Sequence, residues 1–150
     1  MKSTIKIQTK KSYTVIGFIV AITVATFAAL LFSGCSSTAG NDPAFPEFVY
    51  RSEQSLEGYR IAAANQDIMQ FIPCYCGCKQ DAEKYRSLKD CFYDRKTGAY
   101  DEHAASCTTC LDEAADLSQW KQEGLTAAQI RERIDTKYAE RGEPTDTPMP

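Results

Sequence analysis

The sequence predicts an all-α domain, or nearly so: a small bundle of four or five short helices with a cysteine cluster and a short hairpin-like loop. Apolar residues recur at helical spacing, most clearly at Ile130, Ile134 and Tyr138. Residues typical of helix starts and stops separate these apolar faces. Six of the seven cysteines lie between residues 74 and 110, where they can pin a core that is small.

Two helices are expected before Pro73. Ser52 or Ser55 can cap the first helix, and Asn65 can cap a second, shorter one. Pro73 ends the second helix because the residue before a proline avoids the helical conformation. The apolar faces of these two helices are Leu56, Tyr59 and Ala63 in the first, and Ile68, Met69 and Ile72 in the second.

The later elements are expected in this order. A short polar helix covers residues 79–88, and residues 94–98 form the turn of a small hairpin. Ser106 can cap a helix that runs to Glu123, with Gly124 as its stop. Thr126 and Gln129 form a capping box, which predicts the start of the last helix. This helix carries the apolar face of Ile130, Ile134 and Tyr138.

The first 34 residues are predicted to be an export signal. Four basic residues and no acidic residue precede Cys35, and an apolar run from Tyr13 to Phe32 follows them. The basic residues are Lys2, Lys6, Lys10 and Lys11. From Cys35 onward, 13 basic residues face 20 acidic ones, a net charge of −7. An acidic body without a basic stripe argues against nucleic acid as a partner.

Cys35 follows Ser33 and Gly34, and this segment resembles the lipobox of bacterial lipoproteins, whose cysteine is diacylated and becomes the mature N-terminus. The alternative is an uncleaved transmembrane anchor, since about 20 apolar residues span a bilayer. Either interpretation places the rest of the chain at the extracytoplasmic face of the cell membrane, attached to that membrane.

These signals divide the chain into four parts. Residues 1–34 are the signal peptide, and residues 35–46 are the lipidated cysteine with a polar, proline-containing tether. Residues 47–141 form the helical domain. Residues 142–150 include three prolines and are expected to form a disordered tail.

The densest motif is the hexapeptide Pro-Cys-Tyr-Cys-Gly-Cys at residues 73–78. In an extended chain, alternate side chains face one side about 6.5–7 Å apart. Gly77 permits a tight turn that brings the sulfur atoms of this motif closer together.

Three more cysteines follow the hexapeptide. Cys91 stands alone, and Cys107 and Cys110 share one helix face at positions i and i+3. That face continues into the core through Ala114 and Leu117. The single histidine of the chain, His103, precedes Cys107 by four residues.

Taken together, these motifs resemble a family of exported bacterial lipoproteins defined by the PCYCGC hexapeptide. The resemblance extends to the segment 87–92, to Asp101 and His103, to the Cys-x-x-Cys at 107–110 and to the closing helix at 130–138. It covers most of residues 45–140. The family has no agreed activity, so the resemblance implies a lipoprotein in which the six thiols matter and supplies no reaction.

The first interpretation of the six thiols is a soft-metal site. Thiolates select Cu(I) or Zn(II), whereas carboxylates select hard cations. Zinc fingers usually space their cysteine pairs more widely, so the Cys-x-Cys-x-Cys spacing favours a metal–thiolate cluster or Cu(I). The chain would then be a non-enzymatic lipoprotein with a metal-handling partner protein. The expected ligands are Cys74, Cys76, Cys78, Cys91, Cys107, Cys110 and His103.

The second interpretation is a disulfide-stapled structural or interaction lipoprotein without metal. An oxidising compartment and an even number of cysteines permit three bridges. Neighbours in Cys-x-Cys pair poorly, so each cysteine of the hexapeptide would pair with a later one. Each bridge could add about 2–4 kcal/mol of stability.

The third interpretation is a thiol–disulfide oxidoreductase. Cys107 stands near the start of a predicted helix, where the helix dipole favours a thiolate. No βαβ pattern surrounds the motif, so a thioredoxin-like fold is not predicted and no catalytic residue is assigned. The neighbouring acidic residues are interpreted as the solvated face of that helix: Asp112, Glu113 and Asp116.

Overall fold

The computed structural model describes residues 44–150, and within this range it contains five α-helices, three short 3₁₀-helices and a single antiparallel bridge, Tyr93 to Tyr100. The α-helices are α2 (Glu53–Ala64), α3 (Gln66–Met69), α4 (Leu88–Phe92), α5 (Thr108–Gln122) and α6 (Ala127–Tyr138). The 3₁₀-helices are η1 (Glu47–Arg51), η2 (Cys78–Asp81) and η3 (His103–Ser106). The all-α prediction is confirmed. The expected signal peptide and the expected lipidation site at Cys35 lie outside the described residues.

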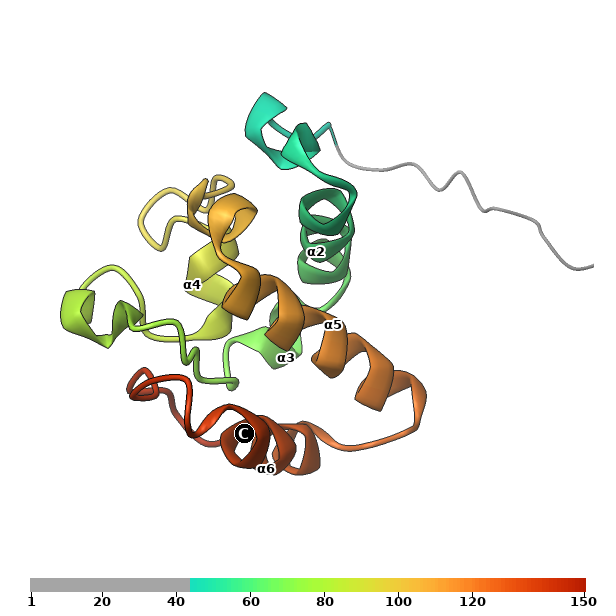
Figure 1. The fold of residues 1–150 in the computed structure, drawn as a ribbon, viewed down its shortest axis with the longest axis vertical. Coiled ribbons are helices and arrows are strands. Elements are labelled where there is room, and N and C mark those ends of the chain that lie inside the picture. Colours follow the sequence, from blue (N-terminus) through green and yellow to red (C-terminus); the bar gives the residue numbers. More distant parts are fainter. Residues whose placement is uncertain (1–43) are drawn as a thin grey trace, which may run out of the picture. The chain divides into compact units, whose positions relative to one another are not determined.

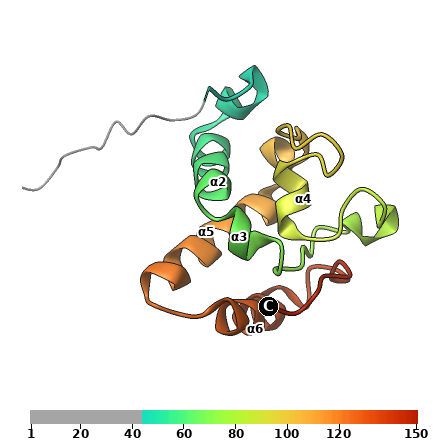
Figure 2. The ribbon, with the colours of Figure 1, turned by 180° about the vertical axis from the view of Figure 1, so that it is seen from behind.

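Helix α5 is central to the fold (Figure 1). Helices α2, α4 and α6 all contact it, as does η3. In the opposite view, α3 lies between α2 and α4 (Figure 2). The face of α5 that these elements cover consists of fully or almost fully buried residues, including Cys110, Leu111, Ala114 and Leu117. None of the helices in the described range is long and apolar enough to cross a bilayer.

The start of the domain is held by an aromatic cluster around Tyr59 of α2. Ser52 caps α2 as predicted, because its side chain accepts a hydrogen bond of 3.0 Å from the Ser55 N–H. The fully buried Tyr59 ring makes edge contacts with Phe45, Phe48, Phe92 and Tyr100. Because Phe45 is itself buried, the folded unit begins inside the stretch that composition assigns to the tether.

The chain between α3 and α4 differs from the prediction. Asn65 stands at the N-cap of α3, but its side chain donates back to the Ile61 carbonyl at 2.8 Å. The expected polar helix over residues 79–88 is reduced to the single turn of η2. Ser87 with Asp90 makes a capping box that starts α4, so Leu88 belongs to that later helix. The sequence places Cys91 just before the hairpin turn at residues 94–98, but in the structure Cys91 lies on α4.

The last two helices follow the prediction closely. Helix α5 begins one residue later than expected, with Cys107 rather than Ser106 at its N-cap. Gly124 follows α5 with φ 86°, as a C-terminal stop requires. The capping box of Thr126 and Gln129 starts α6. The apolar face of α6 is buried against the core: Ile130, Ile134 and Tyr138.

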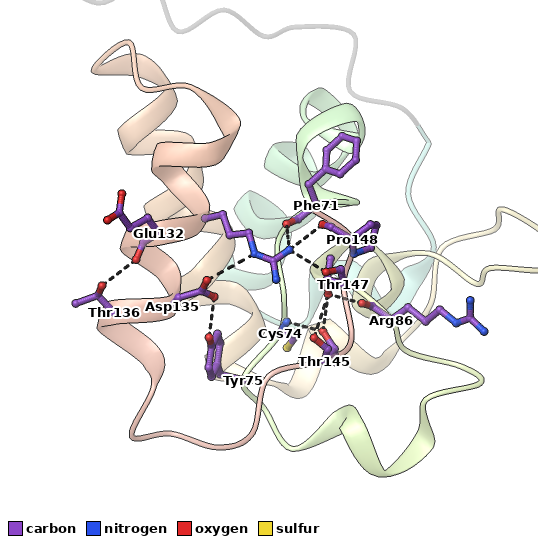
Figure 3. Close-up of polar contacts among 11 residues, drawn as sticks. Phe71, Cys74, Tyr75, Arg86, Glu132, Asp135, Thr136, Thr145, Thr147 and Pro148 are labelled. Carbon is purple, nitrogen blue, oxygen red and sulfur yellow. Dashed lines mark hydrogen bonds and ion pairs between the residues drawn. The ribbon is translucent and has the colours of Figure 1, made fainter. Parts of the chain in front are cut away.

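Composition predicts that residues 142–150 form a disordered tail. In the structure this C-terminal segment lies against the hexapeptide segment (Figure 3). Thr145 makes two hydrogen bonds with Cys74: its side chain accepts from the Cys74 N–H at 2.9 Å, and its N–H donates to the Cys74 carbonyl at 3.1 Å. Arg131 of α6 donates to the carbonyls of Phe71, Thr147 and Pro148. These polar contacts hold the segment in place, and a rule based on proline content does not detect them.

Candidate metal centre

Three sulfur atoms of the site come from the hexapeptide segment, residues 73–78. The chain leaves the buried Pro73 without helical structure, and Gly77 then adopts a left-handed backbone (φ 87°, ψ 5°) that leads into η2. Glycine adopts this conformation without a steric cost, so the predicted turn is confirmed. In this arrangement Cys74 is fully buried, Cys78 is almost fully buried and Cys76 is half-buried.

Helices α4 and α5 supply the other three sulfur atoms. Cys91 is fully buried on α4, and the Leu88 N–H at the start of that helix donates to the Ile72 carbonyl at 2.7 Å. This bond holds α4 against the chain that leads into the hexapeptide. Cys107 at the N-cap of α5 is half-buried, whereas Cys110 in the first turn is fully buried.

His103, the first residue of η3, joins the same cluster. Its backbone N–H donates to the Asp101 carboxylate at 2.9 Å, and its ring packs on Tyr85 with the ring centroids 4.8 Å apart. These contacts direct Nε2 toward two sulfur atoms, Cys78 Sγ at 3.1 Å and Cys76 Sγ at 3.5 Å. The histidine thus lies where the ligand prediction requires it.

Seven side chains therefore form one thiol cluster, and all seven were expected from the sequence. Within it, three groups of four have all their ligand atoms within 4.8 Å of one another. The groups are Cys74, Cys76, Cys91 and Cys110; Cys76, His103, Cys107 and Cys110; and Cys76, Cys78, Cys91 and His103. The six cysteines of the described range are free thiols, with Cys74 Sγ and Cys110 Sγ 3.5 Å apart. The geometry is therefore one that can hold a metal ion.

The thiols of the cluster shift one another's acidity. Hydrogen bonds among the sulfur atoms raise the pKa of Cys91 and of Cys110, with burial adding to both shifts. A hydrogen bond with Cys107 is the largest cause that lowers the pKa of Cys76. The same partner, followed by Cys76 and Cys78, raises the pKa of His103 to about 12. A cation bound in the cluster would displace the protons of the thiols and of the imidazole that it occupies.

Glu113 is a member of this site that the sequence analysis misplaced. Instead of lying on a solvated face, it is fully buried, and its Oε1 accepts a hydrogen bond of 2.9 Å from the Tyr75 N–H. Burial is the largest cause that raises the pKa of its carboxyl group well above the ordinary value. Its spacing was the available signal, because Glu113 is three residues after Cys110 and so shares the face that points into the core.

The remaining acidic residues of α5 are only partly consistent with a solvated face. Asp112 and Asp116 are both half-buried. Asp116 accepts a hydrogen bond of 2.7 Å from the Tyr138 hydroxyl and forms an ion pair with Lys137, so it links α5 to α6.

The comparisons with known proteins agree with the motif-based resemblance. The family model described as "Protein of unknown function with PCYCGC motif" matches residues 35–150, which is most of the chain. Neither the curated proteins nor the solved structures gave a match. The fold and the thiol cluster described above lie wholly within the matched residues. The chain belongs to the PCYCGC-motif family of proteins of unknown function.

Proposed function

We propose that this protein is an extracytoplasmic, membrane-anchored lipoprotein that binds a soft metal ion, Cu(I) or Zn(II), through its thiol cluster. The single observation that carries the proposal is the convergence of six thiols and one imidazole from four separate segments of the chain. Such a convergence gathers ligands that are far apart in sequence, with Cys74 and Cys110 separated by 36 residues.

The ligand distances support binding of an ion within the cluster. A metal–sulfur bond of ~2.3 Å lets two sulfur atoms on one ion lie up to ~4.6 Å apart. The separations in the cluster include 3.1 Å between Cys78 Sγ and His103 Nε2, and none within a group exceeds 4.8 Å, so they fall close to this range. Only small shifts of side chains are needed for several ligands to reach one ion.

The chemistry of the ligands supports a soft ion. One group of four consists of sulfur atoms alone, and the other two consist of three sulfur atoms and one nitrogen. Thiolates and imidazole suit Cu(I) and Zn(II), and they are poor ligands for Mg²⁺ or Ca²⁺. The close Cys-x-Cys-x-Cys spacing favours Cu(I) as the first candidate.

The burial of three of the six thiols supports their role as metal ligands. A fully buried thiol cannot attack a substrate disulfide, whereas it can bind an ion. Cys110, the second cysteine of the Cys-x-x-Cys, is fully buried, and so are Cys74 and Cys91. Metal ions are small enough to enter such a site, and a metal-handling partner protein could exchange them at the half-buried Cys76 and Cys107.

The test is metal titration of the full chain, purified in detergent under reducing and anaerobic conditions, followed by native mass spectrometry. We expect Cu(I) to bind, and Cys74→Ser to lose metal. Cys35→Ser is the comparison variant, because it makes the same change at a cysteine that the proposal assigns to the lipid anchor and not to the cluster. Failure of the reduced protein to bind Cu(I) or Zn(II) would overturn the proposal. Protein isolated from membranes with no free thiol would favour the disulfide-stapled alternative.

The membrane anchor is tested separately at Cys35. When the chain is produced with its own signal in a bacterial host, a clickable palmitate analogue should label the wild type and leave Cys35→Ala unlabelled. Labelling that persists in Cys35→Ala would contradict a lipid anchor at this residue.

A further inference from the structure

We propose that the thiol cluster holds two metal ions, which share the sulfur of Cys76. The inner ion is bound by Cys74, Cys91, Cys110 and the shared sulfur, and the outer ion by Cys78, His103 and the shared sulfur. This inference rests on the proposed function, since it assumes that the cluster binds a soft metal. It adds how many ions are bound and how the two differ.

The overlap of the ligand groups points to a shared sulfur. Cys76 is the one residue that belongs to all three groups of four. The all-sulfur group and the group with Cys78 also have Cys91 in common, and we assign Cys91 to the inner ion because it is fully buried. A thiolate sulfur has several lone pairs and can bridge two ions, which makes Cys76 suited to this position.

The histidine decides how the groups can be filled together. Two of the three groups both include His103, whose Nε2 lies 3.1 Å from Cys78 Sγ and 3.5 Å from Cys76 Sγ. A ring nitrogen has one lone pair and binds one ion, so these two groups cannot both be filled. Two ions must therefore occupy the all-sulfur group and one of the groups that contain His103.

We assign the outer ion to the histidine-containing group that includes Cys78. His103 Nε2 lies 3.1 Å from Cys78 Sγ and 3.5 Å from Cys76 Sγ, so these three atoms already form a compact set of ligands. The all-sulfur group is equally compact, with Cys74 Sγ and Cys110 Sγ 3.5 Å apart. Cys107 remains beside the outer ion as a half-buried thiol through which that ion can enter or leave.

Burial predicts that the two ions exchange at different rates. The three inner cysteines, Cys74, Cys91 and Cys110, are each fully buried. In the outer set, Cys76 and His103 are half-buried and Cys78 is 8% exposed. The outer ion is therefore the one that a partner or chelator reaches first. Binding of each ion releases the protons of the thiols that it occupies, and neither metal nor sulfur changes oxidation state.

The first experiment counts the ions. The full chain, reduced and anaerobic in detergent, is titrated with Cu(I) and weighed by native mass spectrometry. Two bound ions, with a metal–metal distance visible in X-ray absorption spectra, support the inference. Saturation with one ion would overturn it while leaving the proposed function intact. No bound ion would overturn the proposed function itself, so the two failures are distinguishable.

The second experiment compares two variants of the same motif, Cys74→Ser and Cys78→Ser. Each makes the same chemical change, one in the inner set only and the other in the outer set only. We expect each variant to lose one ion of the two. The ion left in Cys78→Ser should transfer slowly to a Cu(I) chelator, and the ion left in Cys74→Ser quickly. Circular dichroism checks that both variants fold, and equal rates in folded variants would contradict the division into inner and outer ions.

Discussion

The carboxylate of Glu113 accepts a hydrogen bond of 2.9 Å from the backbone N–H of Tyr75, and this bond joins α5 to the segment between Cys74 and Cys76. Both partners are buried, so water cannot replace either of them. The second carboxyl oxygen, Oε2, makes no hydrogen bond with the described residues. Glu113 thus fixes the backbone that carries two ligands of the site.

Removing this acceptor should destabilise the protein. Two replacements of Glu113 separate its role as a hydrogen-bond acceptor from any role of its charge. In Glu113→Leu the Tyr75 N–H loses its partner, and a buried unsatisfied donor costs about 1–3 kcal/mol of the free energy of unfolding. Glu113→Gln keeps an acceptor for that N–H and resembles the protonated carboxyl group that burial favours. We expect Glu113→Gln to unfold at or above the denaturant midpoint of the wild type, and Glu113→Leu well below it. Equal midpoints for the two variants would contradict this role.

Comparison with the sequence shows what local patterns can and cannot supply. Periodic apolar residues and capping boxes predicted α2 and α6 because those signals act within one turn of a helix. The members of the cysteine and histidine cluster were also predictable, since cysteine and histidine are rare and their spacing is distinctive. The start of α4 was missed because Ser87 and Asp90 form a capping box with Asp, outside the usual Ser-x-x-Glu pattern.

Sequence patterns could not predict the features that depend on contacts between residues far apart in the sequence. Nothing local indicates that Thr145 bonds to Cys74, 71 residues earlier, so the tail was expected to be disordered. The same applies to the approach of Gly142 to the hexapeptide, where a Cβ atom at residue 142 would lie 2.8 Å from the Tyr75 carbonyl oxygen. Glu113 was predictable only in part. Its spacing from Cys110 indicates that it faces the core, but nothing local indicates its hydrogen bond with the Tyr75 N–H.

The bond between Thr145 and Cys74 predicts that the C-terminal segment protects the inner thiols. Thr145→Val keeps the shape of the side chain and removes the acceptor for the Cys74 N–H, at an expected cost of about 1–3 kcal/mol. The metal-free variant should react faster with a thiol-specific reagent at Cys74. Thr136→Val is the matched control, since Thr136 is exposed and bonds only within α6 to the Glu132 carbonyl. An unchanged rate in Thr145→Val would show that the segment does not cover Cys74.

The turn at Asp94 should give the stability of the protein a dependence on acid pH. Backbone and side-chain hydrogen bonds from Thr97 are the largest causes that hold the pKa of the Asp94 carboxyl below its ordinary value of 3.8. A lowered pKa in the folded state means that the ionised group stabilises the fold above the ordinary value, and that this stabilisation is lost as the pH falls through the folded pKa. Asp94→Asn should therefore lower the thermal midpoint at neutral pH and approach the wild type in acid. A difference that is constant across this pH range would contradict the argument.

Gly58 lets α2 lie close against α5, because a Cβ atom built there would overlap Leu111 of α5. In a helix interior, glycine is usually about 0.5–1 kcal/mol worse than alanine. Overpacking a core costs about 1–3 kcal/mol, so we expect Gly58→Ala to destabilise the protein despite its better helix propensity. A double-mutant cycle with Leu111→Ala isolates the cause, since removal of the Leu111 methyl groups leaves room for the new Cβ atom. Gly58→Ala should be destabilising in the wild-type background and neutral or stabilising in Leu111→Ala. If both backgrounds respond equally, the close packing of α2 on α5 is not what requires glycine at this position.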